Sequence, residues 1–357
     1  EGSEECEVLI LDDFSNSNPL IINKLNKMVN NVKVYARDCR DTIDDILTNH
    51  KIDGVIHFAA SKAVGESVNN PLEYYDNNIN SLLNILDACK RFDIRSLVFS
   101  SSCSLYGDVD KLPVNEDTEL SDPQSPYAYT KLVGERIISD FYNSNSNISV
   151  VSLRYFNPVG AHESGEIGEY PITKPNNILP VICNSADTGE EMVVFGDTYD
   201  TRDGSCIRDY VHVSDIARAH VDSLNYMSSN VGICDVINLG SGDGVSVLEL
   251  IKTFEEVNGV NINYKISDAR EGDIVQIYSD SSKAKKLLGW ETKSTFNCFN
   301  NGYNGNLLLG ILFCICYGNT CCLRVSWPAT EVIDSAIFLL QNTSLFLRLV
   351  GQVITNI

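Results

Sequence analysis

A tyrosine and a lysine four residues apart, Tyr127 and Lys131, are the side chains in this sequence whose types and spacing best suit acid–base chemistry. On a helix, positions i and i+4 share one face, so the ammonium group of Lys131 can lie near the phenol of Tyr127. A nearby positive charge lowers the pKa of the phenol toward neutrality. Together with the serine-rich strand end at 99–104, the pair predicts a general base for carbohydrate hydroxyl groups. In isolation, the same spacing more often belongs to an ordinary helix surface.

The elements that must position this pair follow a regular alternation. Short apolar runs predict buried strands, and the amphipathic stretches between them predict helices. The predicted strands cover residues 8–11, 32–35, 55–58, 97–99 and 150–153, and the predicted helices cover residues 17–29, 41–50, 71–92 and 127–142. This alternation is typical of an α/β fold with a doubly wound parallel sheet, in which a ligand binds in the cleft at the strand ends.

The composition restricts the partners of the protein. The chain of 357 residues has a formal net charge of -21 and a sequence pI of about 4.5. Repulsion opposes binding to nucleic acid or to an anionic membrane, so an anionic ligand must meet locally placed arginines. The scattered cysteines lack the spacing of zinc sites, so no metal is expected. With no signal peptide at the start, they indicate reduced thiols in a cytoplasmic protein.

Three regions differ in composition. Residues 1–157 carry the alternation and are predicted to form a nucleotide-binding domain that lacks its first strand. Residues 158–293 have long loops rich in Gly, Pro, Asp and Asn, and they are predicted to form a smaller lobe interleaved with that domain. Residues 294–357 contain four charged residues, and glycines interrupt their apolar, cysteine-rich segment 307–323. We expect this tail to be foreign to the domain, in preference to a membrane anchor or a metal site.

Seven motifs in one order closely resemble the UDP-glucose 4-epimerases, which are extended short-chain dehydrogenases/reductases. The motifs are HFAASKAVGES at 57–67, YYDNN at 74–78, serines 100–102, YAYTK at 127–131, RYFNPVGAH at 154–162, RDYVHVSD at 208–215 and REGD at 270–273. The resemblance implies interconversion of UDP-galactose and UDP-glucose, with NAD as a bound cofactor in a Rossmann-like domain and the UDP-sugar in the smaller lobe. It also implies a homodimer formed through helices at about 75–92 and 127–142.

The resemblance implies roles for particular residues. Tyr127 takes the proton of the sugar 4-hydroxyl while carbon 4 gives its hydride to NAD, and the resulting 4-keto sugar turns over before the hydride returns to its other face. Ser102 hydrogen-bonds the same oxygen, and Lys131 binds the nicotinamide ribose. The expected cofactor-binding residues are Asp12, Asp38, Phe58, Ala59, Lys62, Asn77, Ser100, Tyr127, Lys131 and Tyr155. The expected substrate-binding residues are Ser102, Asn157, Asn177, Phe195, Arg208, Arg270, Asp273 and Ile277.

Two features bear on the reaction and on the substrate. Related dehydratases and decarboxylases carry an acidic residue directly after the active-site serine or threonine, whereas Cys103 and Ser104 follow Ser102 here, which favours epimerisation. Ile277 occupies the position that gates the sugar pocket in this family, where tyrosine tends to exclude N-acetylated sugars. Isoleucine is smaller but stiff, so we expect UDP-glucose and UDP-galactose with some access for UDP-N-acetyl sugars.

The start of the chain departs from the family pattern. The family begins with a strand and a G-x-x-G-x-x-G turn that receives the pyrophosphate of NAD. Here residues 1–5 contain one glycine and three acids, and they lead into the match to the second strand. We therefore expect an empty central position in the sheet between the strands 8–11 and 55–58. Two hypotheses follow: an epimerase, or a truncated non-catalytic relative that binds sugar nucleotide through Asn157, Arg208 and Arg270.

Overall fold

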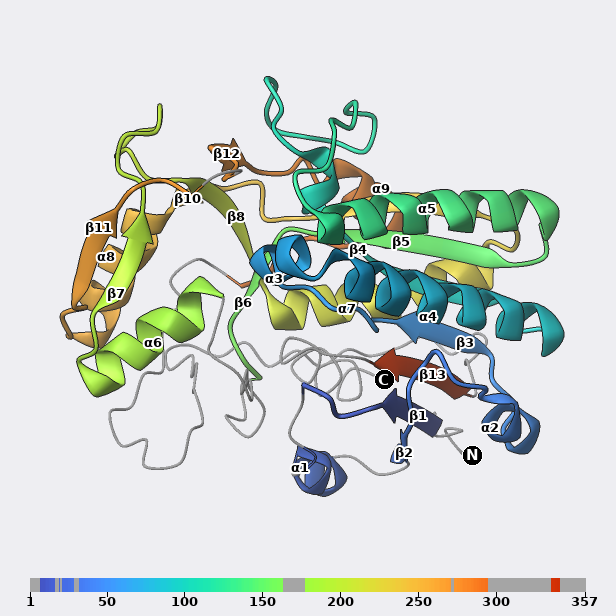
Figure 1. Ribbon diagram of the computed structural model, residues 1–357. Helices are drawn as coiled ribbons and strands as arrows, with labels where there is room; N and C mark the ends of the chain where they lie inside the picture. The colour runs from blue at the N-terminus through green and yellow to red at the C-terminus, as the bar shows by residue number, and fades with distance from the viewer. Residues whose placement is uncertain are drawn as a thin grey trace.

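A seven-stranded sheet forms the centre of the molecule, with helices on both faces (Figure 1). The computed structural model describes residues 7–16, 19, 21–28, 32–162, 177–270 and 273–294, together with the backbone of residues 335–340. Across the sheet the strands are β2 (Val32–Ala36), β1 (Glu7–Asp12), β13 (Ser335–Leu340), β3 (Gly54–His57), β4 (Ser96–Ser102), β5 (Ser149–Tyr155) and β9 (Cys234–Leu239). Every neighbouring pair is parallel, which confirms the predicted doubly wound α/β fold.

Two separate hydrophobic cores explain why the strands read as continuous apolar runs. In β1, Val8 and Ile10 pack into one core, whereas Leu9 and Leu11 pack into the other, because successive side chains of a strand point to opposite faces. The first core is covered by α1 (Ile21–Met28) and α7 (Val213–Ser229). The second is covered by α2 (Asp44–Asn49), α4 (Pro71–Arg91) and α5 (Pro126–Ser144), and the short α3 (Val64–Asn69) precedes α4.

Helix α5 begins where its sequence predicts. The side-chain oxygen of Ser125 accepts a hydrogen bond from the backbone N–H of Ala128 at 3.2 Å, and Pro126 occupies the first helical position, where no intrahelical N–H bond is lost. Tyr127 therefore lies in the first turn of the helix and Lys131 in the second. The predicted helix at 127–142 is confirmed, and it runs beside α4 on one face of the sheet (Figure 1).

The position between β1 and β3 is filled, contrary to the sequence expectation that it would be empty. Strand β13, from the C-terminal region, pairs in parallel with β1 from Glu7–Ser335 to Asp12–Leu340. Its other edge pairs in parallel with β3 from Gly54–Ala336 to His57–Leu339. Both edges therefore have hydrogen-bonding partners, and the sheet is continuous from β2 to β9. Pattern alone could not reveal this because the pairing joins the two ends of the chain.

A second, smaller set of strands and helices carries the remaining loops. Strand β8 (Ile207–His212) pairs with β6 (Asn157–Val159), β10 (Gly244–Ser246) and β12 (Gln276–Ile277), and β7 (Met192–Phe195) pairs with β11 (Tyr264–Ser267). The helices are α6 (Ile178–Thr188) and α8 (Val247–Asn258), which share a third hydrophobic core with β7. Helix α9 (Ser282–Leu288) returns to the first core, which includes Ala284 and Trp290. The chain thus passes repeatedly between the two parts.

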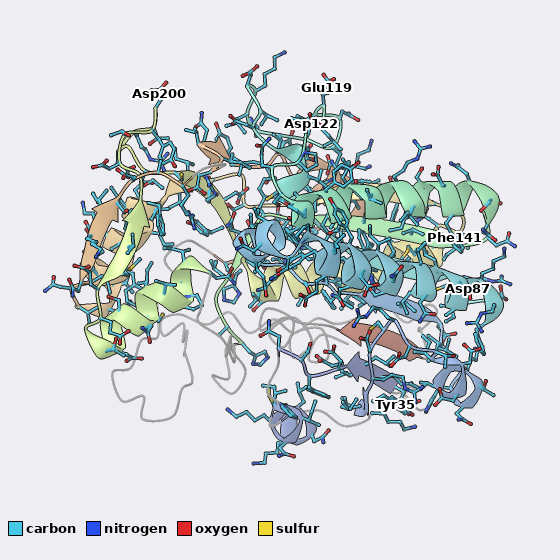
Figure 2. The ribbon with its side chains drawn as sticks, in the orientation of Figure 1. Tyr35, Asp87, Glu119, Asp122, Phe141 and Asp200 are labelled. Atoms are coloured by element: carbon cyan, nitrogen blue, oxygen red, sulfur yellow. The ribbon has the colours of Figure 1, made fainter. Side chains whose placement is uncertain are left out.

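The surface agrees with the acidic composition. Acidic side chains lie at the outer edge of the molecule, among them Asp87, Glu119, Asp122 and Asp200 (Figure 2). Among the described residues, no helix is long and apolar enough to cross a membrane, and no three potential metal ligands come together. The apolar segment 307–323 and its cysteines, for which we expect neither an anchor nor a metal site, lie outside the described residues.

Candidate active site

The three predicted catalytic side chains lie together at the carboxyl edge of the sheet. Ser102 is the last residue of β4, and Tyr127 and Lys131 extend from the first two turns of α5. The Ser102 side chain lies close enough to the phenol of Tyr127 to favour its ionised form. The Nζ atom of Lys131 donates to the carbonyl oxygen of Ser100 at 2.7 Å, and it lies 5.9 Å from the centre of the Tyr127 ring. One strand end and one helix face thus assemble the predicted constellation.

The protonation of this pair differs from the sequence expectation. Burial raises the pKa of the Tyr127 phenol to about 12, although the hydrogen bond from Ser102 acts in the opposite direction. Burial also lowers the pKa of Lys131 to about 7, against the attraction of the Glu135 carboxylate. Without a bound cofactor, the site therefore favours a neutral phenol instead of the expected phenolate. A further positive charge near the phenol would lower this pKa.

The predicted cofactor residues follow the carboxyl ends of neighbouring strands. Asp12 ends β1, Phe58 and Ala59 follow β3, and Tyr155 ends β5 opposite Ser102. The carboxylate of Asp38, after β2, forms an ion pair with Arg40 at 2.6 Å. This is the edge at which doubly wound sheets bind nucleotides.

The donors of Lys131 also suit a cofactor. Lys131 as a whole is 4% exposed, and its ammonium group can donate three hydrogen bonds. Among the described residues it donates only to Ser100. The remaining N–H groups suit ribose hydroxyls, so the residues present fit a nicotinamide dinucleotide.

Two asparagines of the YYDNN motif organise the loop after β3. The side chain of Asn77, a predicted cofactor residue, donates to Ser61 Oγ at 3.1 Å. Asn78, which the sequence reasoning did not single out, accepts from the backbone N–H of Ser61 at 2.7 Å and donates to Thr130 Oγ1 at 3.0 Å. Asn78 therefore ties this loop, which also carries Lys62, to α5. Its place in a family motif was the signal that could have identified it.

The predicted substrate residues form two groups. Arg270 stacks on the ring of Phe195, with the guanidinium carbon 4.4 Å from the ring centre, and its Nε donates to Asp273 at 3.1 Å. Arg208 on β8 lies opposite Ile277 on β12. Ile277 is 2% exposed and belongs to the first hydrophobic core, so its gating role stays a prediction. Of the remaining predicted residues, Asn157 begins β6, which pairs with β8, and Asn177 precedes α6.

Asp209, a buried aspartate next to Arg208 in the chain, connects β8 to two other segments by hydrogen bonds. Asp209 is fully buried, and its carboxylate accepts hydrogen bonds from the backbone N–H groups of Ser241, Gly242 and Ser279 at 2.7, 3.1 and 3.0 Å. Burial raises the pKa of this carboxyl group, and these hydrogen bonds oppose the shift. The charges of Arg208 and Asp209 also act on the pKa of the Cys103 thiol, which follows Ser102 in the chain.

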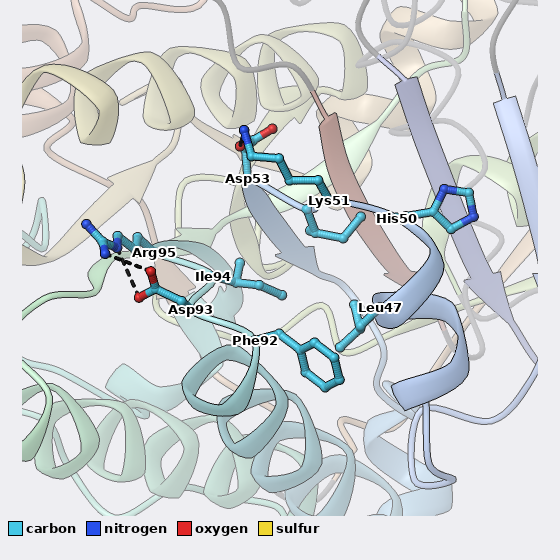
Figure 3. Close-up of a pocket in the computed structure, with 9 residues that line it drawn as sticks. Leu47, His50, Lys51, Asp53, Phe92, Asp93, Ile94 and Arg95 are labelled. Carbon is cyan, nitrogen blue, oxygen red and sulfur yellow. Dashed lines mark hydrogen bonds and ion pairs between the residues drawn. The ribbon is translucent and has the colours of Figure 1, made fainter.

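A pocket at the opposite edge of the sheet does not belong to this site. It opens where β3 and β4 begin, between the end of α2 and the end of α4 (Figure 3). An ion pair between Arg95 and Asp93 at 2.7 Å lies at one side of it. The active-site serines lie at the far end of β4, so the length of the strand separates the pocket from Tyr127 and Lys131.

Comparisons with known proteins agree with this geometry. A family model described as GDP-mannose 4,6 dehydratase matches residues 3–299. The UDP-glucose 4-epimerase of Bacillus subtilis is 42% identical over 304 residues, which cover 82% of this chain and 89% of that protein. The UDP-glucose 4-epimerase of Neisseria meningitidis serogroup C is 44% identical over 291 residues, which cover 80% and 86%.

Solved structures are similar as well. UDP-glucose 4-epimerase from Bifidobacterium longum, in complex with NAD+ and UDP, matches with a TM-score of 0.79 and 42% identity, covering 82% of this chain and 88% of that one. The UDP-Glc/GlcNAc 4-epimerase from Campylobacter jejuni matches with a TM-score of 0.70 and 30% identity, covering 83% and 97%.

Proposed function

Because this chain belongs to the UDP-glucose 4-epimerases of the extended short-chain dehydrogenase/reductase family, we propose that it interconverts UDP-galactose and UDP-glucose in galactose metabolism. The observation that carries the proposal is that Ser102, Tyr127 and Lys131 lie together at one strand end. The alternative, a non-catalytic sugar-nucleotide binder, is not favoured, because such a protein needs no assembled base.

Each residue of the site has a separate proposed role. Tyr127 takes the proton of the sugar 4-hydroxyl, and Ser102 orients that oxygen by a hydrogen bond. When bound, NAD supplies the hydride acceptor for carbon 4 and a positive charge beside the phenol. Lys131 holds the nicotinamide ribose, Asp12 binds the adenosine ribose, and Asp38 lies beside the adenine. Arg208 and Arg270 bind the diphosphate of the UDP-sugar, which an otherwise acidic protein requires.

Epimerisation is the reaction proposed, although the matching family model is described as a dehydratase. Elimination of water needs an additional acid or base beside the substrate. The two residues after Ser102 are Cys103 and Ser104, and burial raises the pKa of the Cys103 thiol to about 12. A thiol in this state is not an effective acid at neutral pH, so neither residue supplies that function.

The test is a direct assay of the full-length protein with UDP-galactose and NAD. We expect UDP-glucose to form, detected by a coupled UDP-glucose dehydrogenase, and no 4-keto-6-deoxy sugar to accumulate. Co-purified NAD is measured in a separate portion of the protein before any NAD is added, by releasing the nucleotide, reducing it enzymatically and detecting NADH fluorescence. A protein that holds NAD and is folded but forms no UDP-glucose contradicts the proposal.

The substrate range is predicted to extend beyond the simple sugars. The residue at the gating position, Ile277, is smaller than tyrosine, and a structural relative is titled a UDP-Glc/GlcNAc 4-epimerase. We expect turnover of UDP-N-acetylgalactosamine at a kcat/KM about tenfold or more below that for UDP-galactose, because branching at the first torsion restricts the pocket. Parallel kinetics with the two substrates measure this ratio. Equal values, or a complete absence of turnover of the N-acetylated sugar, contradict the prediction.

We propose a homodimer formed through α4 and α5, which lie side by side on one face (Figure 1). Leu72 on α4 is 82% exposed and Leu83 is 46% exposed, so this layer presents apolar side chains to solvent. Replacing Leu83 with glutamate is expected to shift the protein from dimer to monomer, because it buries charges at the interface. Light scattering after gel filtration measures the mass. A wild-type protein that is monomeric at micromolar concentration, or a dimeric Leu83→Glu variant, argues against this interface.

We also propose a cytoplasmic location. The six cysteines in the part of the chain that the structure describes, including the exposed Cys234, are free thiols. Free thiols are typical of proteins kept in a reducing compartment.

A further inference from the structure

A buried carboxylate lies directly behind the catalytic pair. Glu135 is one helical turn after Lys131 on α5, and its side chain is 10% exposed. Its Oε1 accepts from Ser101 Oγ at 2.6 Å and from Arg154 Nε at 2.9 Å, and its Oε2 accepts from Arg154 Nη2 at 2.6 Å. The Arg154 side chain is 5% exposed, so the two-pronged ion pair is shielded from solvent.

The partner of Glu135 on β4 is Ser101, which lies between Ser100 and Ser102. The carbonyl of Ser100 accepts from Lys131, and the side chain of Ser102 lies near the phenol of Tyr127. Ser101, between them, donates to the Glu135 carboxylate. Helix α5 thus meets the end of β4 at three successive residues, and hydrogen bonds join it to Ser100 and Ser101.

The second partner of Glu135 is Arg154, which connects it to β5 and to the segment that follows Ser102. Arg154 lies opposite Ser101 in the parallel pairing of β5 with β4. Its Nη1 donates to the hydroxyl of Tyr106 at 2.9 Å, and Tyr106 donates to Asn238 Oδ1 on β9 at 2.7 Å. Tyr106 ends the short 3-10 helix at Cys103–Tyr106, which directly follows Ser102. Through this network, the end of β4 is connected to α5 and also to β5 and β9.

The charges around Lys131 give Glu135 a second effect. Lys131 faces Tyr127 and Glu135 on its own helix, the ring of Phe99 on β4 at 5.1 Å, and buried His57 on β3. Burial and Lys131 lower the pKa of His57 to about 3, so this imidazole is neutral. Glu135 is the carboxylate that raises the pKa of Lys131 against burial. With a neutral side chain at 135, Arg154 would keep its positive charge without this counter-ion.

We propose that Glu135 is a positioning residue of the reaction: it fixes α5 on the ends of β4 and β5 and so holds Tyr127 near Ser102 and Lys131 at the Ser100 carbonyl. The inference rests on the proposed epimerase function for its kinetic consequences. Its consequence for the state of Lys131 holds independently of turnover.

The test compares Glu135→Gln with Asp215→Asn in the NAD-loaded, full-length protein. Asp215 is a matched control on α7, because its buried carboxylate also bonds an arginine, with Arg218 Nη1 at 2.9 Å, and two backbone N–H groups. Both variants should unfold at lower temperature. Only Glu135→Gln should lower kcat for UDP-galactose, by about tenfold to a hundredfold, with little change in KM, because misplacement affects the reacting groups.

The sign of the pH effect follows from the charge. Loss of the carboxylate lowers the pKa of Lys131, so the alkaline limb of the kcat profile should move to lower pH in Glu135→Gln. Glu135→Asp, which keeps the charge, should restore the position of this limb. The Asp215→Asn profile should match the wild type. A wild-type kcat and pH profile in Glu135→Gln, or the same shift in both variants, overturns the proposal.

A second readout does not depend on activity. Carbon-13 labelling at lysine Cε, with the signal assigned by its loss in Lys131→Met, follows the titration of Lys131 directly. We expect the midpoint to fall in Glu135→Gln and to stay unchanged in Asp215→Asn. An unchanged midpoint in Glu135→Gln rejects the role of Glu135. If the wild-type protein shows no turnover, a midpoint that still falls in Glu135→Gln supports the role of Glu135 and rejects the epimerase function instead.

Discussion

Replacing Tyr127 with phenylalanine is expected to lower kcat for UDP-galactose by about a hundredfold to ten-thousandfold, the range that a positioned general base contributes. The substitution removes the phenolic hydroxyl near Ser102 and leaves the ring in place. Little change in stability is expected, because the aromatic ring is retained. The measurement is kcat with saturating UDP-galactose, together with the NAD content of the purified variant.

The matched control is Tyr129→Phe. Tyr129 lies two residues along the same helix and is 46% exposed, so the change removes a hydroxyl of the same type outside the site. Its kcat should equal that of the wild type. If Tyr127→Phe retains NAD and turns over at more than a tenth of the wild-type rate, Tyr127 is not the base.

The pKa of Tyr127 makes this result informative about the cofactor as well. Burial raises the pKa of the phenol to about 12 in the protein alone, so its deprotonated form is scarce near neutral pH. Positive charge beside the ring favours the phenolate. Phenolate absorbance, followed as the pH is raised, should therefore appear at lower pH in the NAD-loaded protein than in the protein freed of NAD. Its absence from Tyr127→Phe identifies the group.

Replacing Ile337 with proline is expected to destabilise the folded state by about 3 kcal/mol or more, because proline cannot donate a backbone hydrogen bond and is excluded from central strands. Residue 337 is in the middle of β13, where it pairs with Leu9 on one side and with Val55 on the other. A loss of this size is a large share of the stability of a typical domain. Urea or thermal unfolding measures it.

The control is Ile337→Val, which keeps the backbone donor and should change the free energy of unfolding by no more than about 1.5 kcal/mol. A shortened chain that ends at residue 334 should be unstable for the same reason, since β1 and β3 would lose their shared neighbour. Unfolding of Ile337→Pro at the same denaturant concentration as the wild type would show that β13 does not contribute to the sheet.

Local pattern predicted most of the elements that position the site. Apolar runs three to four residues long identified β1 to β5. Strands β1, β3, β4 and β5 are buried on both faces, and such strands need no polar alternation. The spacing of Tyr127 and Lys131 predicted their shared helix face, and α5 contains both. The serines before Cys103 predicted the strand end that meets them. Each of these features depends on residues that are near one another in the chain.

The sequence by itself determined the α/β class, the order of the strands along the chain and the candidate base with its neighbouring lysine and serine. Only the tertiary structure decided that Ser335–Leu340 lies between β1 and β3, that Glu135 pairs with Arg154, and that burial raises the pKa of Tyr127 while lowering that of Lys131. The physical reason is how far apart along the chain the interacting residues lie. Helix faces and strand periodicity depend on neighbours within a few residues, whereas strand order, ion pairs and desolvation depend on segments that meet only after the chain has folded.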